Sequence, residues 1–551
     1  MMILIERLRH FPRFSLSLTS FNFILALWLS LGLNVAFFEK IHALTPYAGF
    51  KSWAFVTATI LLLICYFNVL MQILQWGKLA KITALIFVTL GGFTAYFVNS
   101  LGVVMSPDQI QNMMQTDTAE VFDLLSWQFF TWTFFFVLVP ILCILNFTIR
   151  PNTWQKNLKS KIMHILASFA LILPILFIYY VDFAAIFREN RELKGMISPQ
   201  NSISSLMSYY RHKSPPVNLP LQHYGEDAHR VQDAHTQIPK LMVLVVGETA
   251  RAESFSLNGY AKNTNPELSK QEIINFSQVS SCGTATAVSV PCMFSGMPRE
   301  KYDEKLASHR EGLLDLAQRA GYKVTWMDNN SGCKGTCTRV EQYVFPENLK
   351  QKWCADGECH DEILVDALKD YIAHLPEKDT QPRLVVLHQM GSHGPAYFKR
   401  TTAQYQPFKP SCDTKAIQGC TPEELINSYD NSIVYTDHVL SQTIDLLKQQ
   451  THYQTGFWYL SDHGESTGEH GLYLHGAPYM MAPTQQTHIP MLMWFSEQWK
   501  QQQPKQFQCL EKQKNHTLSQ DNLFPSLLSL LDIQSQTIDA KLNLLQQCQT
   551  T

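Results

Sequence analysis

Five long apolar segments dominate the first third of the chain, and shorter apolar segments recur through the remainder. The long segments cover residues 21–38, 53–73, 82–98, 127–147 and 162–181. Each is about as long as the roughly 20 residues with which an α-helix crosses the hydrocarbon core of a bilayer. Five such segments in succession favour membrane spans over the alternative, buried helices of a soluble protein. We therefore predict a transmembrane domain of five helices over residues 1–181.

Basic residues in the connecting segments predict how this domain is oriented. They are concentrated before the first span, after the second and after the fourth: Arg7, Arg9, Arg13, Lys78, Lys81, Arg150, Lys156, Lys159 and Lys161. The third connection, residues 100–126, has no Lys or Arg, although Lys40 and Lys51 in the first connection weaken the contrast. Because cytoplasmic loops are enriched in basic residues, we predict a cytoplasmic N-terminus. Five spans then place everything after residue 181 outside the cytoplasm.

Residues 241–551 have a different pattern, in which short continuous apolar runs alternate with longer helical segments. The runs at residues 241–246, 323–327, 384–387, 456–460 and 489–495 are typical of buried parallel strands. Helices are predicted near residues 312–320, 361–375 and 423–449. This alternation predicts an α/β domain whose mostly parallel central sheet has helices on both faces. For residues 182–240, before this domain, we expect an interfacial helix followed by an extended, Pro-rich linker.

The cysteines indicate the compartment of this second domain. Ten of the twelve follow residue 280, an even number that is typical of disulfides in an oxidising compartment. Proximity suggests the pairs Cys282–Cys292, Cys333–Cys337, Cys354–Cys359, Cys412–Cys420 and Cys509–Cys548, although spacing alone does not fix connectivity. A zinc site of four cysteines is the rival interpretation, which the scattered positions and the lack of a repeated CxxC disfavour. The net charge of −2 gives no indication of a nucleic-acid partner.

Residues of metal-binding type follow several predicted strands. They are Glu248 after the first strand, His388 and His393 after the third, and Asp462 and His463 after the fourth, where Gly464 would allow a sharp turn. Ligands of parallel sheets bind beyond the carboxyl ends of the strands, so these side chains are expected to converge. Carboxylate and imidazole groups together suit zinc. Singly, each fits a structural role, such as a capped turn at Asp462; jointly, they favour a metal site.

A segment rich in small hydroxyl residues offers a nucleophile. Residues 282–292 contain Thr284, Thr286 and Ser289 between the cysteines of one suggested disulfide. A hydroxyl is a weak nucleophile unless a base or a metal ion favours its alkoxide. At a helix start, backbone N–H groups would also face an incoming phosphate. Spacing does not choose among the three hydroxyls, and a small-residue helix that packs closely on the sheet is the alternative.

Five motifs occur in order after the predicted spans: Gly247-Glu248-Thr249-Ala250-Arg251, Cys282-Gly283-Thr284-Ala285-Thr286, Asp328-Asn329-Asn330-Ser331, residues 388–395 and residues 461–466. In this set the chain resembles, over essentially its whole length, the phosphoethanolamine–lipid A transferases of Gram-negative bacteria. Their soluble domain belongs to the alkaline phosphatase/sulfatase superfamily. The resemblance implies that Thr286 is the nucleophile that becomes modified with phosphoethanolamine. It also implies that Glu248, Thr286, Asp462 and His463 hold one zinc ion.

The resemblance further implies which residues bind the substrates. His393 and His475 match histidines that assist phosphate binding or hold a second, weaker zinc, and either could protonate the leaving group. Glu465 matches an acidic residue beside that site, and Asn330 and Lys334 match residues proposed to hold the phosphoethanolamine group. Some relatives lack the cysteine pair that flanks Lys334, which sets this lysine apart from the zinc ligands.

Asn112, Thr116 and Glu120 recur every four residues in the third connection, on the predicted outer side of the membrane. On one continuous helix they would share a face. The resemblance implies that this face binds the head group of the lipid donor, and the Glu120 carboxylate is suited to pair with an ethanolamine ammonium. A solvated amphipathic helix is the alternative.

The implied activity is transfer of phosphoethanolamine from phosphatidylethanolamine to a phosphate of lipid A, through a covalent threonine intermediate. The added ammonium lowers the negative charge of lipid A, and with it the attraction for cationic peptides such as polymyxin. We expect a monomer in the bacterial inner membrane, surrounded by membrane lipids, with its catalytic domain in the periplasm.

Other functions compete with this one. A related periplasmic transferase or phosphodiesterase could act on another glycan, such as core oligosaccharide, and lipoteichoic acid synthases transfer glycerophosphate from a similar topology. A sulfatase is disfavoured, since no Cys/Ser-x-Pro-x-Arg segment lies near Thr286. A non-catalytic membrane sensor is the rival from another class, although every expected zinc position is filled by a suitable residue.

Overall fold

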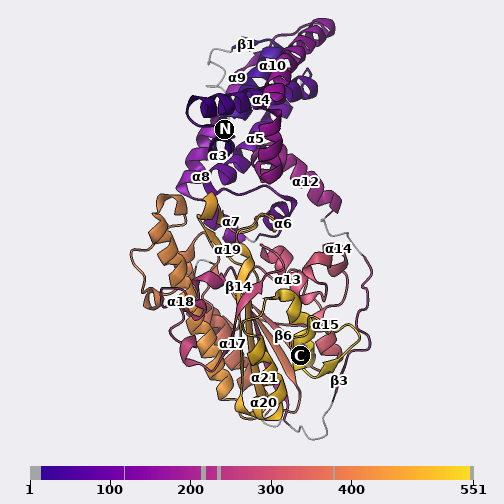
Figure 1. The fold of residues 1–551 in the computed structure, drawn as a ribbon, viewed down its shortest axis with the longest axis vertical. Helices are drawn as coiled ribbons and strands as arrows, with labels where there is room; N and C mark the ends of the chain where they lie inside the picture. The colour runs from indigo at the N-terminus through magenta and orange to yellow at the C-terminus, as the bar shows by residue number, and fades with distance from the viewer. Residues whose placement is uncertain are drawn as a thin grey trace. The chain divides into compact units, whose positions relative to one another are not determined.

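Two compact units make up the chain (Figure 1). The computed structural model describes residues 14–77, 79–116, 118–190, 192–212, 219–231, 238–355, 357–376 and 379–546. The first unit comprises Met1–Ile110 and Leu125–Ser208, and the second comprises Gln111–Leu124 and Tyr209–Thr551. The second unit therefore includes a short stretch of the third connection between the predicted spans.

The first unit is helical, and its long apolar helices correspond to predicted spans. Within the described residues, four helices are long and apolar enough to cross a membrane: α4 (Phe50–Leu74), α5 (Leu79–Leu101), the continuous helix Trp127–Asn146 and α10 (Trp154–Glu189). The third of these consists of α8 (Trp127–Thr133), the π-helical turn η2 (Phe134–Leu138) and α9 (Val139–Asn146). Many of their large apolar side chains are exposed, as expected where the surrounding solvent is lipid.

The first predicted span, residues 21–38, is broken near its middle. Helix α2 (Leu18–Leu27) continues into the π-helical turn η1 (Trp28–Gly32), and α3 (Val35–Leu44) departs at 58°, so the pair adds a fifth span if it is taken as one. At the break, the Asn34 amide donates to the carbonyls of Leu29 (2.7 Å) and Ser198 (3.0 Å). A side chain that takes over backbone carbonyls in this way interrupts the helical hydrogen-bond ladder.

The region after the last span is helical for longer than the apolar pattern indicates. Helix α10 extends beyond the predicted span 162–181 at both ends, and it is followed by α11 (Leu193–Met196) and α12 (Gln200–His212). Helix α12 falls where the interfacial helix was expected. In the predicted linker, residues 213–218 and 232–237 lie outside the described residues, and β3 (His229–Arg230) is a short strand between them.

An eight-stranded sheet forms the centre of the second unit. Its spatial order is β15 (Leu518–Ser519), β5 (Ile274–Ser280), β14 (His488–Phe495), β11 (Gln454–Ser461), β4 (Lys240–Gly247), β10 (Arg383–His388), β6 (Lys323–Asp328) and β7 (Glu341–Tyr343). Only β14 is antiparallel to its neighbours within this sheet. All five predicted strands are present, and the prediction of a mostly parallel α/β domain is confirmed. Strand β5 escapes prediction because its apolar residues do not form a continuous run.

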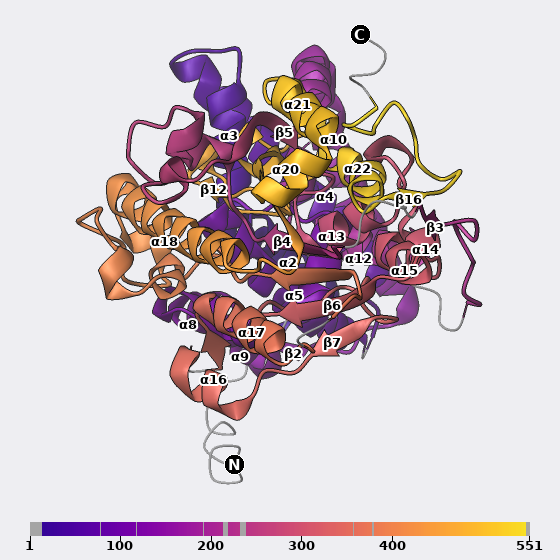
Figure 2. The same cartoon turned by 90° about the horizontal axis from the view of Figure 1, so that it is seen from below.

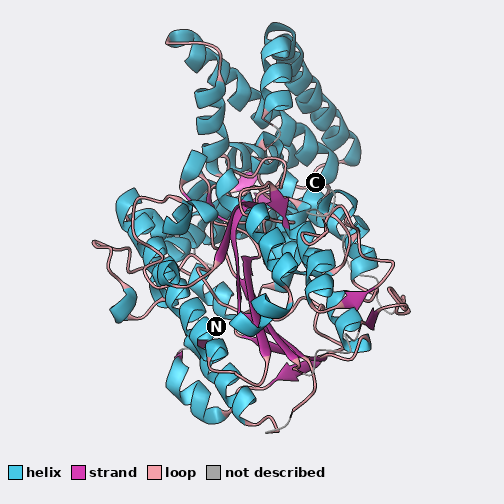
Figure 3. Ribbon diagram, turned by 60° about the horizontal axis from the view of Figure 1, so that its bottom comes forward, coloured by secondary structure: helices cyan, strands magenta, loops and turns pink. Residues whose placement is uncertain are grey.

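Helices cover both faces of the sheet (Figures 2 and 3). On one face lie α17 (Glu362–Ala373) and α18 (Pro422–Lys448), and on the other α13 (Thr286–Phe294), α15 (Leu313–Arg319) and α22 (Leu523–Leu530). Every residue of β4 is buried, and alternate residues from Met242 to Val246 join the core under α13. Because both faces are covered, the strands are continuous apolar runs. Since β4 is an inner strand of the sheet, its carboxyl end lies near the middle of the sheet edge.

Disulfides connect nearby residues of the second unit. Four of the suggested pairs are present as disulfides: Cys282–Cys292, Cys333–Cys337, Cys354–Cys359 and Cys412–Cys420. The fifth suggested pair, Cys509–Cys548, includes Cys548, which lies outside the described residues. Cys65 and Cys143, in the apolar helices, are free thiols.

Candidate metal centre and active site

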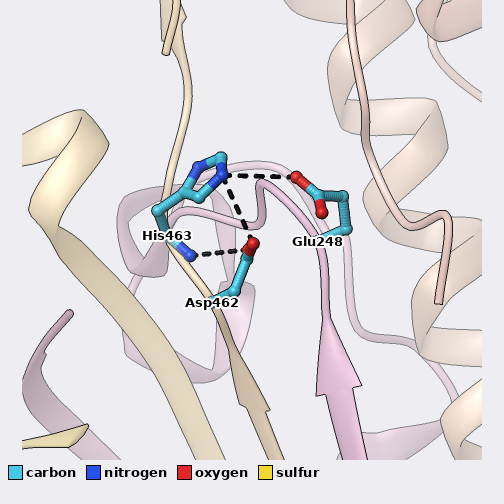
Figure 4. Close-up of side chains that lie close together, drawn as sticks. All are labelled: Glu248, Asp462 and His463. Atoms are coloured by element: carbon cyan, nitrogen blue, oxygen red, sulfur yellow. Dashed lines mark hydrogen bonds and ion pairs between the residues drawn. The ribbon is translucent and has the colours of Figure 1, made fainter. Parts of the chain in front are cut away.

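The carboxyl ends of adjacent strands bring three predicted metal ligands together (Figure 4). Glu248 directly follows β4, and Asp462 and His463 directly follow its neighbour β11. The backbone N–H of Asp462 donates to the Gly247 carbonyl at 2.9 Å, which continues the strand pairing to the ligands themselves. Thr286, the first residue of α13, places its hydroxyl 2.9 Å from Glu248 Oε2. We call Glu248, Asp462 and His463 the carboxylate cluster; all three are completely buried.

Three oxygen atoms lie around His463 Nε2 at the separation expected between ligands of a tetrahedral metal site. His463 Nε2 lies 3.3 Å from Glu248 Oε1, 3.3 Å from Asp462 Oδ2 and 3.3 Å from Thr286 Oγ1. Tetrahedral zinc ligands at about 2.0–2.1 Å from the ion lie about 3.3–3.4 Å from one another. The arrangement of these atoms therefore fits one zinc ion.

Hydrogen bonds around the cluster leave two carboxylate oxygens and one imidazole lone pair without a donor. His463 Nδ1 lies 2.9 Å from the Gly464 carbonyl, so Nδ1 carries the ring proton and Nε2 presents a lone pair. Asp462 Oδ1 accepts backbone N–H bonds from Thr249 (3.2 Å) and His463 (2.7 Å). Asp462 Oδ2 and Glu248 Oε1 are buried and have no hydrogen-bond partner among the described residues. Bare carboxylate oxygens beside a lone pair are costly to bury unless a cation joins them.

The electrostatics of the cluster favour added positive charge. Burial, together with the charge of Asp462, raises the pKa of Glu248 to about 7. Burial also raises the pKa of Asp462. Burial and the neighbouring His475 lower the pKa of His463 to about 4, so its imidazole is neutral at neutral pH. The two carboxylates resist ionisation because they are buried, and the imidazole is neutral. A divalent cation bound to all three would supply positive charge and favour the ionised carboxylates.

The structure distinguishes the three hydroxyls that spacing left open. Thr286 Oγ1 donates to Glu248 Oε2 at 2.9 Å, inside the carboxylate cluster. Thr284 donates instead to the Ala477 carbonyl at 2.6 Å, and the Ser289 hydroxyl donates to a backbone carbonyl. Thr286 is therefore the hydroxyl of this segment whose partners are the cluster's own side chains.

Imidazoles form a second cluster beside the first. His475 Nδ1 donates to Glu465 Oε2 at 2.9 Å, and the Tyr397 hydroxyl donates to Glu465 Oε1 at 2.6 Å. The centroid of the His475 ring lies 4.6 Å from that of His463 and 5.3 Å from that of His393. Burial and the nearby His475 lower the pKa of His393 well below its usual range. We call His393, His475 and Glu465 the histidine cluster.

The two predicted phosphoethanolamine-binding residues have different surroundings. Asn330 Nδ2 donates to Glu248 Oε2 at 2.8 Å and to the Gln389 carbonyl at 2.7 Å, so this side chain touches the carboxylate cluster. Lys334 Nζ donates to the Ser331 carbonyl and hydroxyl at 3.0 and 2.8 Å. The lysine is thus held by the residue that follows Asn330.

The predicted donor-binding helix is not continuous. Asn112 lies in α6 (Pro107–Gln115) and Glu120 in α7 (Thr118–Leu124), and the helix is interrupted at Thr116. Thr116 Oγ1 donates to the Asn112 carbonyl at 2.7 Å and so takes an acceptor that a continuing helix would use. The expectation that the three residues share one helix face is therefore wrong. The Glu120 side chain lies outside the described part of the structure.

Comparisons with known proteins identify the family. A family model described as "Phosphoethanolamine transferase EptA/EptB" matches residues 63–214, and one described as "Sulfatase" matches residues 240–533. Phosphoethanolamine transferase EptA of Escherichia coli strain K12 is 41% identical over 545 residues, which are 98% of this chain and 98% of that protein. This chain belongs to the phosphoethanolamine transferase family.

Two further relatives of this transferase extend the comparison to function and structure. Phosphatidylethanolamine transferase Mcr-1 of Escherichia coli is 34% identical over 532 residues, covering 93% of this chain and 94% of Mcr-1. The integral membrane protein lipooligosaccharide phosphoethanolamine transferase A of Neisseria meningitidis has a solved structure that matches with a TM-score of 0.91 and 34% identity, over 97% of this chain and 99% of that chain. The predicted family and fold class, a helical membrane domain with a sulfatase-like α/β domain, are confirmed.

One residue that holds the transferase's site together has no signal in the sequence. Gln520 Nε2 donates to the carbonyls of Ser461 and Asp462 at 2.7 and 2.8 Å. Its Oε1 accepts from the backbone N–H of Cys282 at 2.7 Å. Gln520 thereby connects Cys282, at the start of the segment that contains Thr286, to the backbone beside the predicted metal ligands. A lone glutamine near the end of the chain carries no pattern that would predict this role.

Two glycines of the transferase motifs are required by close packing. A Cβ at Gly464 would lie 2.0 Å from the Gln485 carbonyl oxygen, whereas its φ is not positive; close approach, rather than the expected sharp turn, requires glycine there. Gly391 has a φ of +55°, and a Cβ there would lie 2.5 Å from the Glu248 carbonyl oxygen. The Gly391 N–H also donates to the buried carboxylate of Asp361 at 2.8 Å, which fixes the loop that precedes His393.

Proposed function

We propose that this chain is a zinc-dependent transferase that moves phosphoethanolamine from phosphatidylethanolamine to a phosphate of lipid A, through a covalent intermediate on Thr286. The observation that carries the proposal is the position of the Thr286 hydroxyl, which donates to Glu248 Oε2 at 2.9 Å and lies 3.3 Å from His463 Nε2. The names of the relatives support the substrates: Mcr-1 is a phosphatidylethanolamine transferase, and the Neisseria protein is a lipooligosaccharide phosphoethanolamine transferase.

Glu248, Thr286, Asp462 and His463 would hold the zinc ion, since three oxygens lie 3.3 Å from His463 Nε2 and two of them are carboxylate oxygens without a hydrogen-bond partner among the described residues. When bound, zinc supplies positive charge that favours the deprotonated hydroxyl and the charge that develops on phosphoryl oxygens. His393 and His475 would hold the substrate phosphate or a second, weaker zinc.

In the first half-reaction, the Thr286 oxygen attacks the phosphorus of phosphatidylethanolamine, and the bond from phosphorus to the diacylglycerol oxygen breaks. Glu248 Oε2 already accepts the Thr286 hydrogen and is placed to take the proton. His393 or His475 gives a proton to the departing oxygen, and the bond to Glu465 fixes the orientation of the His475 ring. Phosphoethanolamine remains on Thr286.

In the second half-reaction, a phosphate oxygen of lipid A attacks the same phosphorus and gives its proton to the histidine that served as acid. The bond from phosphorus to the Thr286 oxygen breaks, and this oxygen takes back the proton that Glu248 accepted. The nine-residue helix α13 begins at Thr286, so its backbone N–H groups and helix dipole favour the anionic phosphoryl group throughout. The product carries an added ammonium, which offsets negative charge on lipid A and weakens the attraction for polymyxin.

The remaining predicted residues and the location complete the proposal. Asn330 and Lys334 would hold the phosphoethanolamine group, and Asn112, Thr116 and Glu120 would contact the head group of the donor. The apolar helices support a place in the bacterial inner membrane, and the disulfides support a periplasmic catalytic domain. The basic connections support a cytoplasmic N-terminus. We expect the enzyme to act as a monomer.

Mass spectrometry of lipid A tests the proposal. Cells that express the chain should contain lipid A with one added phosphoethanolamine unit. Thr286→Ala should abolish both this addition and the covalent adduct, whereas Thr286→Ser keeps a hydroxyl and should retain part of both. Unmodified lipid A beside modified core oligosaccharide would redirect the proposal to another acceptor. Modification at the wild-type rate by Thr286→Ala would rule out the mechanism.

A further inference from the structure

The stretch Gln111–Leu124, which we call the inter-span segment, belongs to the same compact unit as the catalytic domain. Near its start, the Gln111 amide donates to the carbonyl of Ala287, the residue directly after the proposed nucleophile, at 3.4 Å. Further along, the Gln115 carbonyl accepts from Lys334 Nζ at 3.2 Å. The first part of the segment is thus attached to two elements of the active site.

The other end of the segment is attached through a cluster of four charged side chains, of which Lys399 is the most exposed, at 34%. Asp123 Oδ1 lies 2.5 Å from Lys399 Nζ, and Oδ2 lies 3.3 Å from Arg400 Nη2. Glu358 contacts the same two cations, at 3.6 and 2.9 Å. Arg400 Nε also donates to the His393 carbonyl at 2.9 Å, so the cluster reaches the histidine cluster through the backbone. Asp123 and Arg400 are only 3% and 5% exposed, and the two acids balance the two bases.

We propose that Asp123 is a positioning residue that docks the inter-span segment onto the catalytic domain and so determines how tightly the lipid donor binds. The inference rests on the proposed function, because the candidate donor-binding residues Asn112, Thr116 and Glu120 lie between the two attached ends. Docking restricts these residues before the donor arrives, which lowers the entropy that binding must remove. The charge cluster contains none of the proposed metal ligands and bonds to His393 only at its backbone carbonyl, so loss of Asp123 weakens donor binding more than it slows the chemical step.

Three variants of the full-length protein in vesicles that contain phosphatidylethanolamine test this inference. They are Asp123→Asn, the double variant Asp123→Asn/Lys399→Met, and Asp379→Asn as a matched control. Asp379 forms an ion pair with Arg383 Nε at 2.6 Å, with both side chains 10% exposed, at the amino end of β10 and so at the opposite edge of the sheet from the site. For each variant we would measure the melting temperature, the maximal rate of adduct formation on Thr286, and the donor mole fraction that gives half that rate.

Asp123→Asn should raise the half-maximal donor fraction at least about tenfold, because it removes the charge of a buried partner in the cluster. Its maximal rate should stay within a few-fold of wild type, and its melting temperature should fall. The double variant restores the balance of charge and should recover the melting temperature, since it leaves no uncompensated cation. Its half-maximal donor fraction should remain high, because the anchoring ion pair is still absent. Asp379→Asn should lower the melting temperature and leave the donor response unchanged.

Three results would overturn the inference and leave the proposed function intact: a wild-type donor response in Asp123→Asn, joint recovery of stability and donor response in the double variant, or an equal shift in Asp379→Asn. The last two would mean that the charge cluster acts only through overall stability. A wild-type protein that forms no adduct from phosphatidylethanolamine would overturn the proposed function and the inference with it.

Discussion

The two clusters at the carboxyl edge of the sheet are both buried, but their charges are satisfied in different ways. In the carboxylate cluster around His463, two carboxylate oxygens have no hydrogen-bond partner among the described residues and face an imidazole lone pair. In the histidine cluster around His475, both oxygens of Glu465 accept hydrogen bonds, one of them from Tyr397. Buried polar atoms in folded proteins are normally paired, so the unpaired oxygens distinguish the first cluster from the second.

This difference indicates that the clusters depend on different partners. The carboxylate cluster has two unpaired oxygens that a cation would satisfy, so we expect its stability to depend on metal. In the histidine cluster, the protein's own hydrogen bonds satisfy both oxygens of Glu465, so the arrangement of Glu465 and His475 is set without an added cation. This fits the proposed roles of its histidines in holding the substrate phosphate and moving protons. Changing one cluster at a time should therefore separate metal content from activity.

The largest effect is expected from Glu248→Gln, a change in the carboxylate cluster. The substitution keeps the shape of the side chain but removes the charge that a divalent ion would balance, so bound zinc should be lost. Activity should fall by more than the roughly 10- to 100-fold that is typical when an outer-shell partner is removed. Metal analysis of the purified protein and its melting temperature with and without a chelator would measure this. A variant that keeps one tightly bound zinc and responds to chelator like wild type would contradict the assignment.

Glu465→Gln is the matched change in the histidine cluster, and it should leave zinc in place. The amide holds His475 less firmly and without charge, so the maximal rate should fall by about 10²-fold, at the lower end of what general acid–base catalysis contributes. Adduct formation on Thr286 and metal analysis of the same sample would check both parts. Loss of zinc together with activity would mean that the two clusters form a single metal site.

A smaller effect is expected from pH, because Glu248 must lose its proton to bind a cation. Its pKa is raised to about 7 by burial and Asp462. In the metal-free protein, the stability gained by protonating Glu248 is present below the ordinary carboxyl pKa and is lost as pH rises through 7. Zinc binding then releases this proton below pH 7, so zinc affinity should fall about tenfold per pH unit from pH 7 to 5.5.

His463 should not add to the dependence of zinc affinity on pH, since its pKa is lowered to about 4 and the ring is already neutral between pH 5.5 and 7. Competition with a metal indicator of known pH dependence would measure the affinity. An affinity that is constant between pH 5.5 and 7 would show that Glu248 is ionised before the metal arrives.

The sequence predicts the carboxylate cluster better than its surroundings. Glu248, Asp462 and His463 directly follow continuous apolar strands, and the parallel-sheet rule places such residues at one edge. Gln520 and Asp361 come from distant segments and have no such rule, because an isolated polar residue does not reveal which backbone groups it will bond. Thr286 needed the family resemblance, since Thr284 and Ser289 have the same chemistry and only the structure shows that the three hydroxyls have different partners.

Departures from regular secondary structure were the least predictable part of the fold. The bend at Asn34 and the interruption at Thr116 both arise where a polar side chain bonds to a backbone carbonyl of its own segment. A hydropathy pattern or a four-residue spacing assumes an unbroken helix and does not register such competition. Asn112, Thr116 and Glu120 therefore share a region of the inter-span segment but not a helix face.

The smallest expected effect is that of Tyr397→Phe, which tests how far the histidine cluster depends on its own hydrogen bonds. The change removes one bond to Glu465, of 2.6 Å, and keeps the ring that packs against Tyr429 with a centroid distance of 5.5 Å. A hydrogen bond to a charged group contributes about 1.5–3 kcal/mol. His475 still bonds to the other oxygen of Glu465, so only part of this free energy should be lost from the stabilisation of the transition state. The maximal rate should therefore fall several-fold, and the zinc content should not change.

Tyr453→Phe is the control, because its hydroxyl makes a similar bond, of 2.7 Å, to Asp379 at the amino end of the strands. If both tyrosine variants slow the enzyme equally, the loss reflects general stability and the histidine cluster does not rely on Tyr397. If Tyr397→Phe alone slows it and zinc is retained, orientation of Glu465 is separable from metal binding. The two clusters then share one edge of the sheet while depending on different partners, one on a cation and the other on a hydroxyl.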